Sequence, residues 1–183
     1  HDGMKTNPFL SKKVRQEELK VIIHNESFRI GPFTITSFAV PHDSFGNNGF
    51  FIEYEDISLC IITDIGHVTP EICDFIKKTT HLIVEANYDT KMLESGPYPL
   101  HLKRRIQGPY GHISNAETAK LLSSSLTPNL IKKVWLCHLS EENNTPDVAA
   151  NTCCEMLQSI PDLQHITPIP LPRRTPTWLI NIK

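Results

Sequence analysis

The chain has 183 residues, a formal net charge of −2, and 39% hydrophobic and 21% charged residues. This length is typical of one domain with a real core, and the ordinary apolar fraction excludes wholesale disorder. No apolar run approaches the ~20 residues that cross a bilayer, and the polar, basic start does not resemble a signal peptide. Near-neutral charge gives no global argument for nucleic-acid binding, so such a partner would need a local basic patch.

The five cysteines include no C-x-x-C pair, and their number is odd. A structural zinc cluster and a disulfide framework are therefore poor interpretations. We expect reduced thiols that act mostly as small core residues in a cytoplasmic protein.

The hydrophobic pattern predicts strands that alternate with helices, which indicates an α/β fold. Strands are expected in residues 28–40 (two strands around a Gly-Pro turn), 50–55, 57–63, 81–86 and 134–139. The proline-rich residues 166–178 predict an irregular or edge-strand tail.

Three helix starts follow from capping signals. Thr69-Pro70 and Thr145-Pro146 each place a capping threonine before a proline, and Ser114 with Glu117 forms a capping box. The expected apolar stripes are Ile72, Phe75 and Ile76 in the first helix, Ala119, Leu122 and Leu126 in the second, and Val148, Thr152, Met156 and Ile160 in the third.

Several of the expected strands end in ionisable residues, namely His42 with Asp43, Asp64, Glu85 and His138. Each alone is more often a turn former, a helix cap or a core histidine, but the repetition favours a shared site beyond the strand ends. Imidazole and carboxylate ligands suit zinc, manganese or iron, and Asp64 is the candidate to bridge two such ions.

A second cluster is the segment 111–115, in which a glycine permits a sharp turn before the capped helix. A helix N-terminus attracts anions, so Ser114 and Asn115 are candidate phosphate contacts and His112 a candidate proton donor. Lys103 and Arg104 in the basic run 103–105 are candidate contacts for a nucleic-acid backbone. The alternative is a capped helix with an exposed histidine and a solvated charged face.

Four segments then resemble the metallo-β-lactamase fold superfamily, and within it the WalJ/YycJ-like branch. They are VPHDSFGNNGFFIE, IITDIGHV, LIVEANYDTKMLESGPYPLHLKRRIQGPYGHISN and VWLCHLSEENNTPDVA, which lie within residues 27–150. The resemblance implies an αββα sandwich with a di-metal site between its two sheets.

The resemblance also implies roles for individual residues. His42, Asp64 and His138 match metal ligands, with Asp64 bridging two divalent ions, zinc or manganese or else iron. His112 matches a histidine near the scissile phosphate in nuclease branches. Glu85 matches a glutamate that orients a neighbouring ligand.

The chain departs from the family pattern in two places. Tyr88 stands where a histidine normally follows E-A-N, and the N-terminal H-x-H-x-D-H motif does not occur. We therefore expect residues 1–183 to be the C-terminal portion of a single metallo-β-lactamase-like domain, which alone binds metal weakly and hydrolyses little. An exposed sheet edge and open apolar face would favour self-association.

The leading hypothesis is a phosphodiesterase or exonuclease that cleaves nucleic acid through a metal-activated hydroxide. One alternative is an acyl hydrolase of the same fold that cleaves a lactone, thioester or amide. The other is a non-catalytic remnant that serves as an interaction module. No membrane partner is expected.

Overall fold

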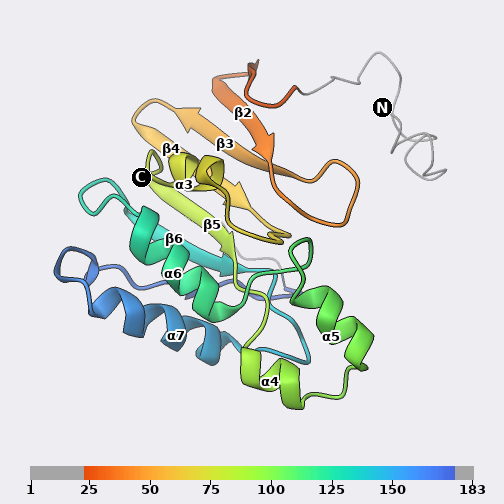
Figure 1. The fold of residues 1–183 in the computed structure, drawn as a ribbon. Coiled ribbons are helices and arrows are strands. Elements are labelled where there is room, and N and C mark those ends of the chain that lie inside the picture. The colour runs from red at the N-terminus through yellow and green to blue at the C-terminus, as the bar shows by residue number, and fades with distance from the viewer. Residues whose placement is uncertain (1–22, 176–183) are drawn as a thin grey trace.

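A seven-stranded mixed sheet organises the computed structural model, which describes residues 23–175 (Figure 1). The strands lie side by side in chain order, and they are β1 (Ser27–Ile30), β2 (Phe33–Ala39), β3 (Asn48–Tyr54), β4 (Ile57–Ile62), β5 (His81–Glu85), β6 (Lys133–Cys137) and β7 (Ile169–Pro170). Pairing is antiparallel from β1 to β4 and parallel from β4 to β7. The predicted α/β class and the predicted strands are confirmed.

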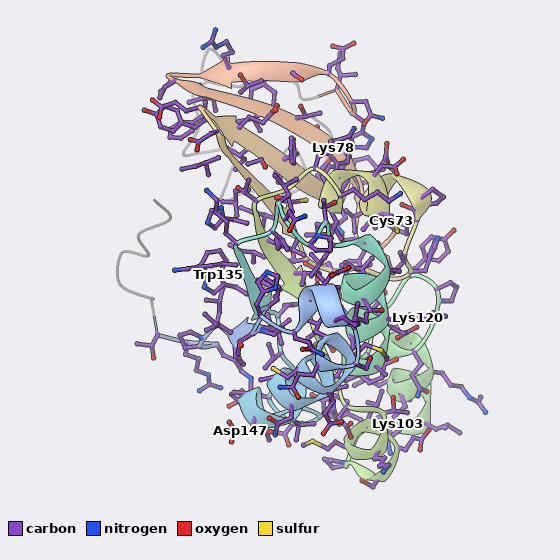
Figure 2. All side chains as sticks on the ribbon, turned by 90° about the vertical axis from the view of Figure 1, so that its left-hand side faces the viewer. Cys73, Lys78, Lys103, Lys120, Trp135 and Asp147 are labelled. Carbon is purple, nitrogen blue, oxygen red and sulfur yellow. The ribbon has the colours of Figure 1, made fainter. Side chains whose placement is uncertain are left out.

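Three helices lie on one face of this sheet, as Figures 1 and 2 both show. They are α3 (Pro70–Ile76), α6 (Asn115–Ser125) and α7 (Pro146–Gln158). Each begins where the sequence predicts, because the side chains of Thr69, Ser114 and Thr145 accept hydrogen bonds from backbone N–H groups of the first helical turn. A short 3₁₀ helix, η2 (Pro161–Leu163), follows α7.

The buried apolar stripe predicted for α7 is wrong by one residue along the helix. The helix buries Ala149, Cys153 and Leu157, whereas Met156 is 39% exposed. Both sets have helical spacing, and the position of α7 beside α6 selects the stripe with the small residues, which allow close approach.

Two further helices, α4 (Thr90–Ser95) and α5 (Leu100–Ile106), were not predicted from the sequence. They lie beyond the ends of the strands rather than over the sheet (Figure 1). Each is one to two turns long, and helices of that length depend on tertiary contacts more than on their own sequence.

The two faces of the sheet differ in burial, as the period of two in each strand requires. Toward the helices, the side chains of Phe38, Cys60, Ile62, Leu82 and Val84 are fully buried. The opposite face is also apolar but is only partly buried at Phe50, Ile52, Leu59, Ile61 and Ile83. No helix within residues 23–175 covers that face, and Figure 2 shows the labelled Trp135 on it. The described residues thus supply one sheet and one helical layer.

All five cysteines are free. In the described part of the chain, no helix is long and apolar enough to cross a membrane.

Candidate metal centre

Four strands run in the same direction and deliver ionisable residues to the same edge of the sheet. Strand β2 is antiparallel to β3, which is antiparallel to β4, so β2 is parallel to β4, β5 and β6. His42, Asp64, Glu85 and His138 follow or close these strands. The strand ends therefore converge as the sequence predicts.

The backbone turns sharply at two of these residues. Asp64 has a φ of 58° and His138 a φ of 54°, both in the left-handed region that non-glycine residues seldom adopt. Such a conformation persists only where the surroundings hold it. Asn47 contributes here, because its Nδ2 donates to the carbonyl oxygen of Asp64 over 2.9 Å.

Glu85 is the centre of the cluster, although its side chain is fully buried. Its Oε1 accepts hydrogen bonds from Nδ1 of His112 over 2.8 Å and from Nδ1 of His138 over 2.6 Å. Its Oε2 accepts one from the backbone N–H of Ile65 over 2.8 Å. Both histidine rings are thus fixed by a carboxylate at Nδ1, which leaves Nε2 of each for other partners.

The charges in this cluster stabilise one another. Burial has the largest single effect on the pKa of Glu85 and raises it, but the hydrogen bonds from His112, His138 and the Ile65 N–H, together with the charge of His112, lower the pKa overall. The hydrogen bond to Glu85 raises the pKa of His138, against an opposing effect of burial. Glu85 is therefore an anion that a histidine proton or a cation stabilises.

His42 and Asp64 complete the arrangement. His42 is anchored through Nδ1 to the carbonyl oxygen of Gly111 at 2.9 Å, and its Nε2 lies 3.5 Å from Oδ1 of Asp64. Oδ1 of Asp64 also lies 3.7 Å from Nδ1 of His138. The ring of His112 lies between those of His42 and His138, with centroid distances of 4.9 and 5.1 Å.

The donor set suits a divalent metal. Asp64, Glu85, His112 and His138 each offer a ligand atom within 4.8 Å of the others. Two imidazoles with two carboxylates match the ligands of zinc, manganese and iron. His42 lies outside this group of four but reaches Asp64, as described above.

Backbone contacts between three loops hold these residues in register. The N–H of Gly66 donates to the carbonyl oxygen of Pro41 over 2.6 Å. A Cβ at Gly66 would lie 2.4 Å from the carbonyl oxygen of Pro109 and 2.6 Å from Cα of Tyr110. The loops that carry His42, Asp64 and His112 therefore meet at a point where only glycine fits.

A pocket of about 350 Å³ opens beside the cluster. His42, His112 and His138 line it, so it adjoins the donor atoms directly. The α4–α5 segment contributes Tyr98, Leu102 and Arg105 to its lining. Its volume lies at the lower end of the range for small-molecule sites.

The residues predicted to bind substrate are placed differently. Lys103 and Arg104 lie on α5 but do not line the pocket, whereas their neighbour Arg105 does. Arg105 forms an ion pair with Asp43 at 2.5 Å. Arg105 belongs to the predicted basic run 103–105, but the individual contacts predicted from that run are Lys103 and Arg104.

Ser114 and Asn115 are buried at the start of α6. The capping box is confirmed, but the N–H and Oγ of Ser114 both donate to the carboxylate of Glu117. The N–H of Asn115 donates to the carbonyl oxygen of Tyr88 over 2.8 Å. These hydrogen bonds occupy the two N–H groups and disfavour phosphate binding at the start of α6. The phosphate contacts of Ser114 and Asn115 stay predictions.

Sequence comparison finds relatives of one kind. The chain is 31% identical over 155 residues to the exodeoxyribonuclease WalJ of Streptococcus pneumoniae, which covers 85% of this chain and 57% of WalJ. It is 31% identical over 128 residues to the exodeoxyribonuclease YycJ of Bacillus anthracis, over 70% of this chain and 48% of YycJ. No family model matches.

Structure comparison finds proteins with the metallo-β-lactamase fold. The metallo-β-lactamase fold protein YhfI of Bacillus subtilis superposes with a TM-score of 0.62 at 14% identity, over 88% of this chain and 56% of YhfI. The chain is thus similar in sequence to WalJ and YycJ, and it has the metallo-β-lactamase fold. Zinc-bound PqqB of Methylobacterium extorquens also superposes, with a TM-score of 0.57 at 18% identity, over 81% of this chain and 52% of PqqB.

The chain spans about half the length of the relatives that it matches. The matched part contains the donor cluster and the pocket.

Proposed function

We propose that the chain belongs to a metal-dependent phosphodiesterase that acts on nucleic acid as an exonuclease. The cluster of His112 and His138 on the buried Glu85, beside a pocket, is the observation that carries the proposal. The names of WalJ and YycJ as exodeoxyribonucleases support it, and they favour DNA as the nucleic acid.

In this proposal His42, Asp64 and His138 would hold two divalent ions of zinc, manganese or iron, whereas Glu85 and His112, the other members of the donor group, have separate roles. When bound, such metal supplies Lewis acidity toward a phosphoryl oxygen and lowers the pKa of a water molecule. Glu85 orients His138 through the hydrogen bond at Nδ1. His42 is oriented in the same way by the carbonyl oxygen of Gly111.

His112 is the proposed proton donor. Its Nδ1 is occupied by Glu85, so Nε2 is the nitrogen that can serve a substrate in the pocket. The hydrogen bond to Glu85 holds the ring in place, and a proton on Nε2 could be donated to the departing oxygen. Substrate phosphate near Arg105 would compete with Asp43 for the guanidinium.

The free cysteines support a reducing compartment, and we propose the cytoplasm as the location. We also propose that the polypeptide 1–183 self-associates through the partly exposed apolar face around Ile61.

The deciding experiment compares wild type with His112→Ala in the full-length gene product. Hydrolysis is measured on labelled DNA, on RNA and on ester and thioester substrates, and bound metal by mass spectrometry. We expect DNA cleavage to fall by about 10²–10⁴-fold with metal content retained. His101→Ala, an exposed histidine on α5, is the matched control and should change neither quantity.

Other outcomes would contradict the proposal. Cleavage of esters or thioesters with little dependence on His112 would indicate an acyl hydrolase. Absence of both metal and hydrolysis in the wild type would indicate a non-catalytic interaction module.

A further inference from the structure

The segment 138–145, which links β6 to α7, carries His138 and is held by side chains that the proposed chemistry does not use. We call it the His138 loop. Its sequence is HLSEENNT. The carbonyl oxygen of His138 accepts a hydrogen bond from Nδ2 of Asn87 over 2.8 Å, and the N–H of Ser140 donates to the carbonyl oxygen of Asn87 over 2.7 Å. The left-handed backbone at His138 is thus tied to the residue two positions after Glu85.

Asn144 holds the other end of this loop from inside the protein. The residue is 1% exposed, and its Nδ2 donates to the carbonyl oxygens of Ala86 and Asn87 over 2.8 and 3.1 Å. It also exchanges two side-chain hydrogen bonds with Asn115, at 2.8 and 2.9 Å. Asn144 therefore links the His138 loop to the segment after Glu85 and to the start of α6, three residues from His112.

Arg173 holds the same loop from outside. Its Nε donates to the carbonyl oxygen of Leu139 over 3.0 Å, and one terminal nitrogen donates to those of Ser140 and Asn144 over 2.7 and 2.8 Å. The next residue, Arg174, differs, because its guanidinium contacts the exposed carboxylate of Glu141 and binds no backbone carbonyl among the described residues. Arg173 thus binds loop backbone, and Arg174 binds a side chain.

A buried amide is a poor source of net stability, since its hydrogen bonds replace those made with water. It is a good source of orientation, because an asparagine side chain donates and accepts in fixed directions. An apolar residue at position 144 could fill the space but could not link the His138 loop to the backbone after Glu85 and to the side chain of Asn115.

We propose that Asn144 and Arg173 are positioning residues, which fix the His138 loop so that the His138 ring meets Glu85. The importance of this placement for hydrolysis rests on the proposed function, whereas the placement itself does not. Neither residue lines the pocket beside the cluster.

The test uses metal-free full-length protein with labelled histidine side chains, and it follows the Nδ1–H signal of His138 by NMR. We expect Arg173→Gln and Asn144→Ala to weaken or shift this signal at temperatures where circular dichroism shows a folded protein. Arg174→Gln is the matched surface control. Ser58→Ala is the buried control, because Ser58 bonds Thr80 and Lys78 at the far ends of β4 and β5. Both controls should leave the signal unchanged.

A second measurement is the absorption spectrum of the cobalt-loaded protein, which reports ligand geometry. It should change in Arg173→Gln and not in Arg174→Gln. If the His138 signal and the cobalt spectrum are unchanged in folded Arg173→Gln, the proposal is overturned, even where Asn144→Ala fails to fold. A wild type that binds no cobalt and cleaves no DNA, with the signal still lost in the variants, would overturn the proposed function and leave the positioning role standing.

Discussion

Nδ1 of His138 lies 2.6 Å from Oε1 of Glu85, and the same oxygen lies 2.8 Å from Nδ1 of His112. One buried carboxylate oxygen therefore sets the tautomer and the direction of two imidazole rings. Glu85 closes β5, whereas His112 and His138 lie on two loops that are each more than twenty residues further along the chain. This oxygen therefore couples the metal side and the substrate side of the site.

Glu85→Gln tests this coupling. The side-chain oxygen of glutamine can accept hydrogen bonds from only some of the N–H groups that Glu85 now binds. The NH₂ group of glutamine repels an Nδ1–H, so the ring of one of the two histidines should turn. We expect metal affinity to fall by about 10–100-fold, measured by competition with a chromophoric chelator. Glu141→Gln, which removes an exposed carboxylate paired with Arg174, is the control. Equal affinity in both variants would contradict the role of Glu85.

Arg105→Gln tests the charge at the pocket. Because Arg105 lines the pocket and Arg104 does not, nucleic-acid binding should weaken more in Arg105→Gln than in Arg104→Gln. The dependence of log affinity on log salt should lose about one unit of slope for a lost phosphate contact. Fluorescence anisotropy over a salt series measures both. A larger effect of Arg104→Gln would instead favour the contact predicted from the sequence.

Gly66→Ala tests the contact between the three loops. The added Cβ would meet backbone atoms of Pro109, Tyr110 and Pro41 at 2.4 to 2.8 Å, and backbone cannot move aside as a side chain can. We expect the free energy of unfolding to fall by about 1–3 kcal/mol in urea titrations. Gly108→Ala is the comparison, since its nearest contacts are 3.2 and 3.3 Å, and it should cost less.

His81 predicts a pH dependence of stability far from the site. Burial lowers its pKa, and the charges of Lys132 and Lys133 lower it further. The unfolded chain, with an ordinary histidine pKa of about 6.5, then binds more protons than the folded one. Its contribution is complete above that pH and is lost as pH falls toward the folded-state pKa, by at most about 1.4 kcal/mol per pH unit.

His81→Phe keeps a ring to stack on Trp135 and removes the titration. Urea unfolding at pH 7.5 and 5.5 should show a smaller loss of stability on acidification in the variant than in wild type. An equal loss in both would mean that other groups carry the acid sensitivity.

Ile61→Lys tests self-association. Ile61 lies on the partly exposed face, paired with Phe50 on one side and Ile83 on the other, so a charge there interrupts the apolar row. We expect light scattering to show a smaller average mass for the variant than for wild type. Ile57→Lys, near the turn at the strand start, is the milder control. A monomeric wild type would exclude this mode of association.

The parts of the fold that local chemistry determines were predictable. Strand alternation and the caps at Thr69, Ser114 and Thr145 depend on neighbouring residues, so their patterns are visible in the sequence. The convergence of Asp64, Glu85 and His138 also follows, because parallel strands end at one edge.

Other features of the fold and of the site depend on tertiary contacts and were not predictable from the local sequence. Asp89 caps α4 and Gly96 follows it, a signal that was present but weak for so short a helix. The choice of Arg105 over Lys103 and Arg104 depends on the rotation of α5 about its axis, which three consecutive basic residues do not specify. The role of Asn87 depends on a residue 51 positions away.

The direction of the strands has a practical consequence. Because the site occupies the edge where β2, β4, β5 and β6 end, the turns at the opposite edge are distant from it. The Glu55–Asp56 turn between β3 and β4 is one of these, and both residues are exposed. A fluorophore, affinity tag or new chain terminus placed there would leave the metal loops untouched, which makes this turn the natural attachment point for immobilising or labelling the protein.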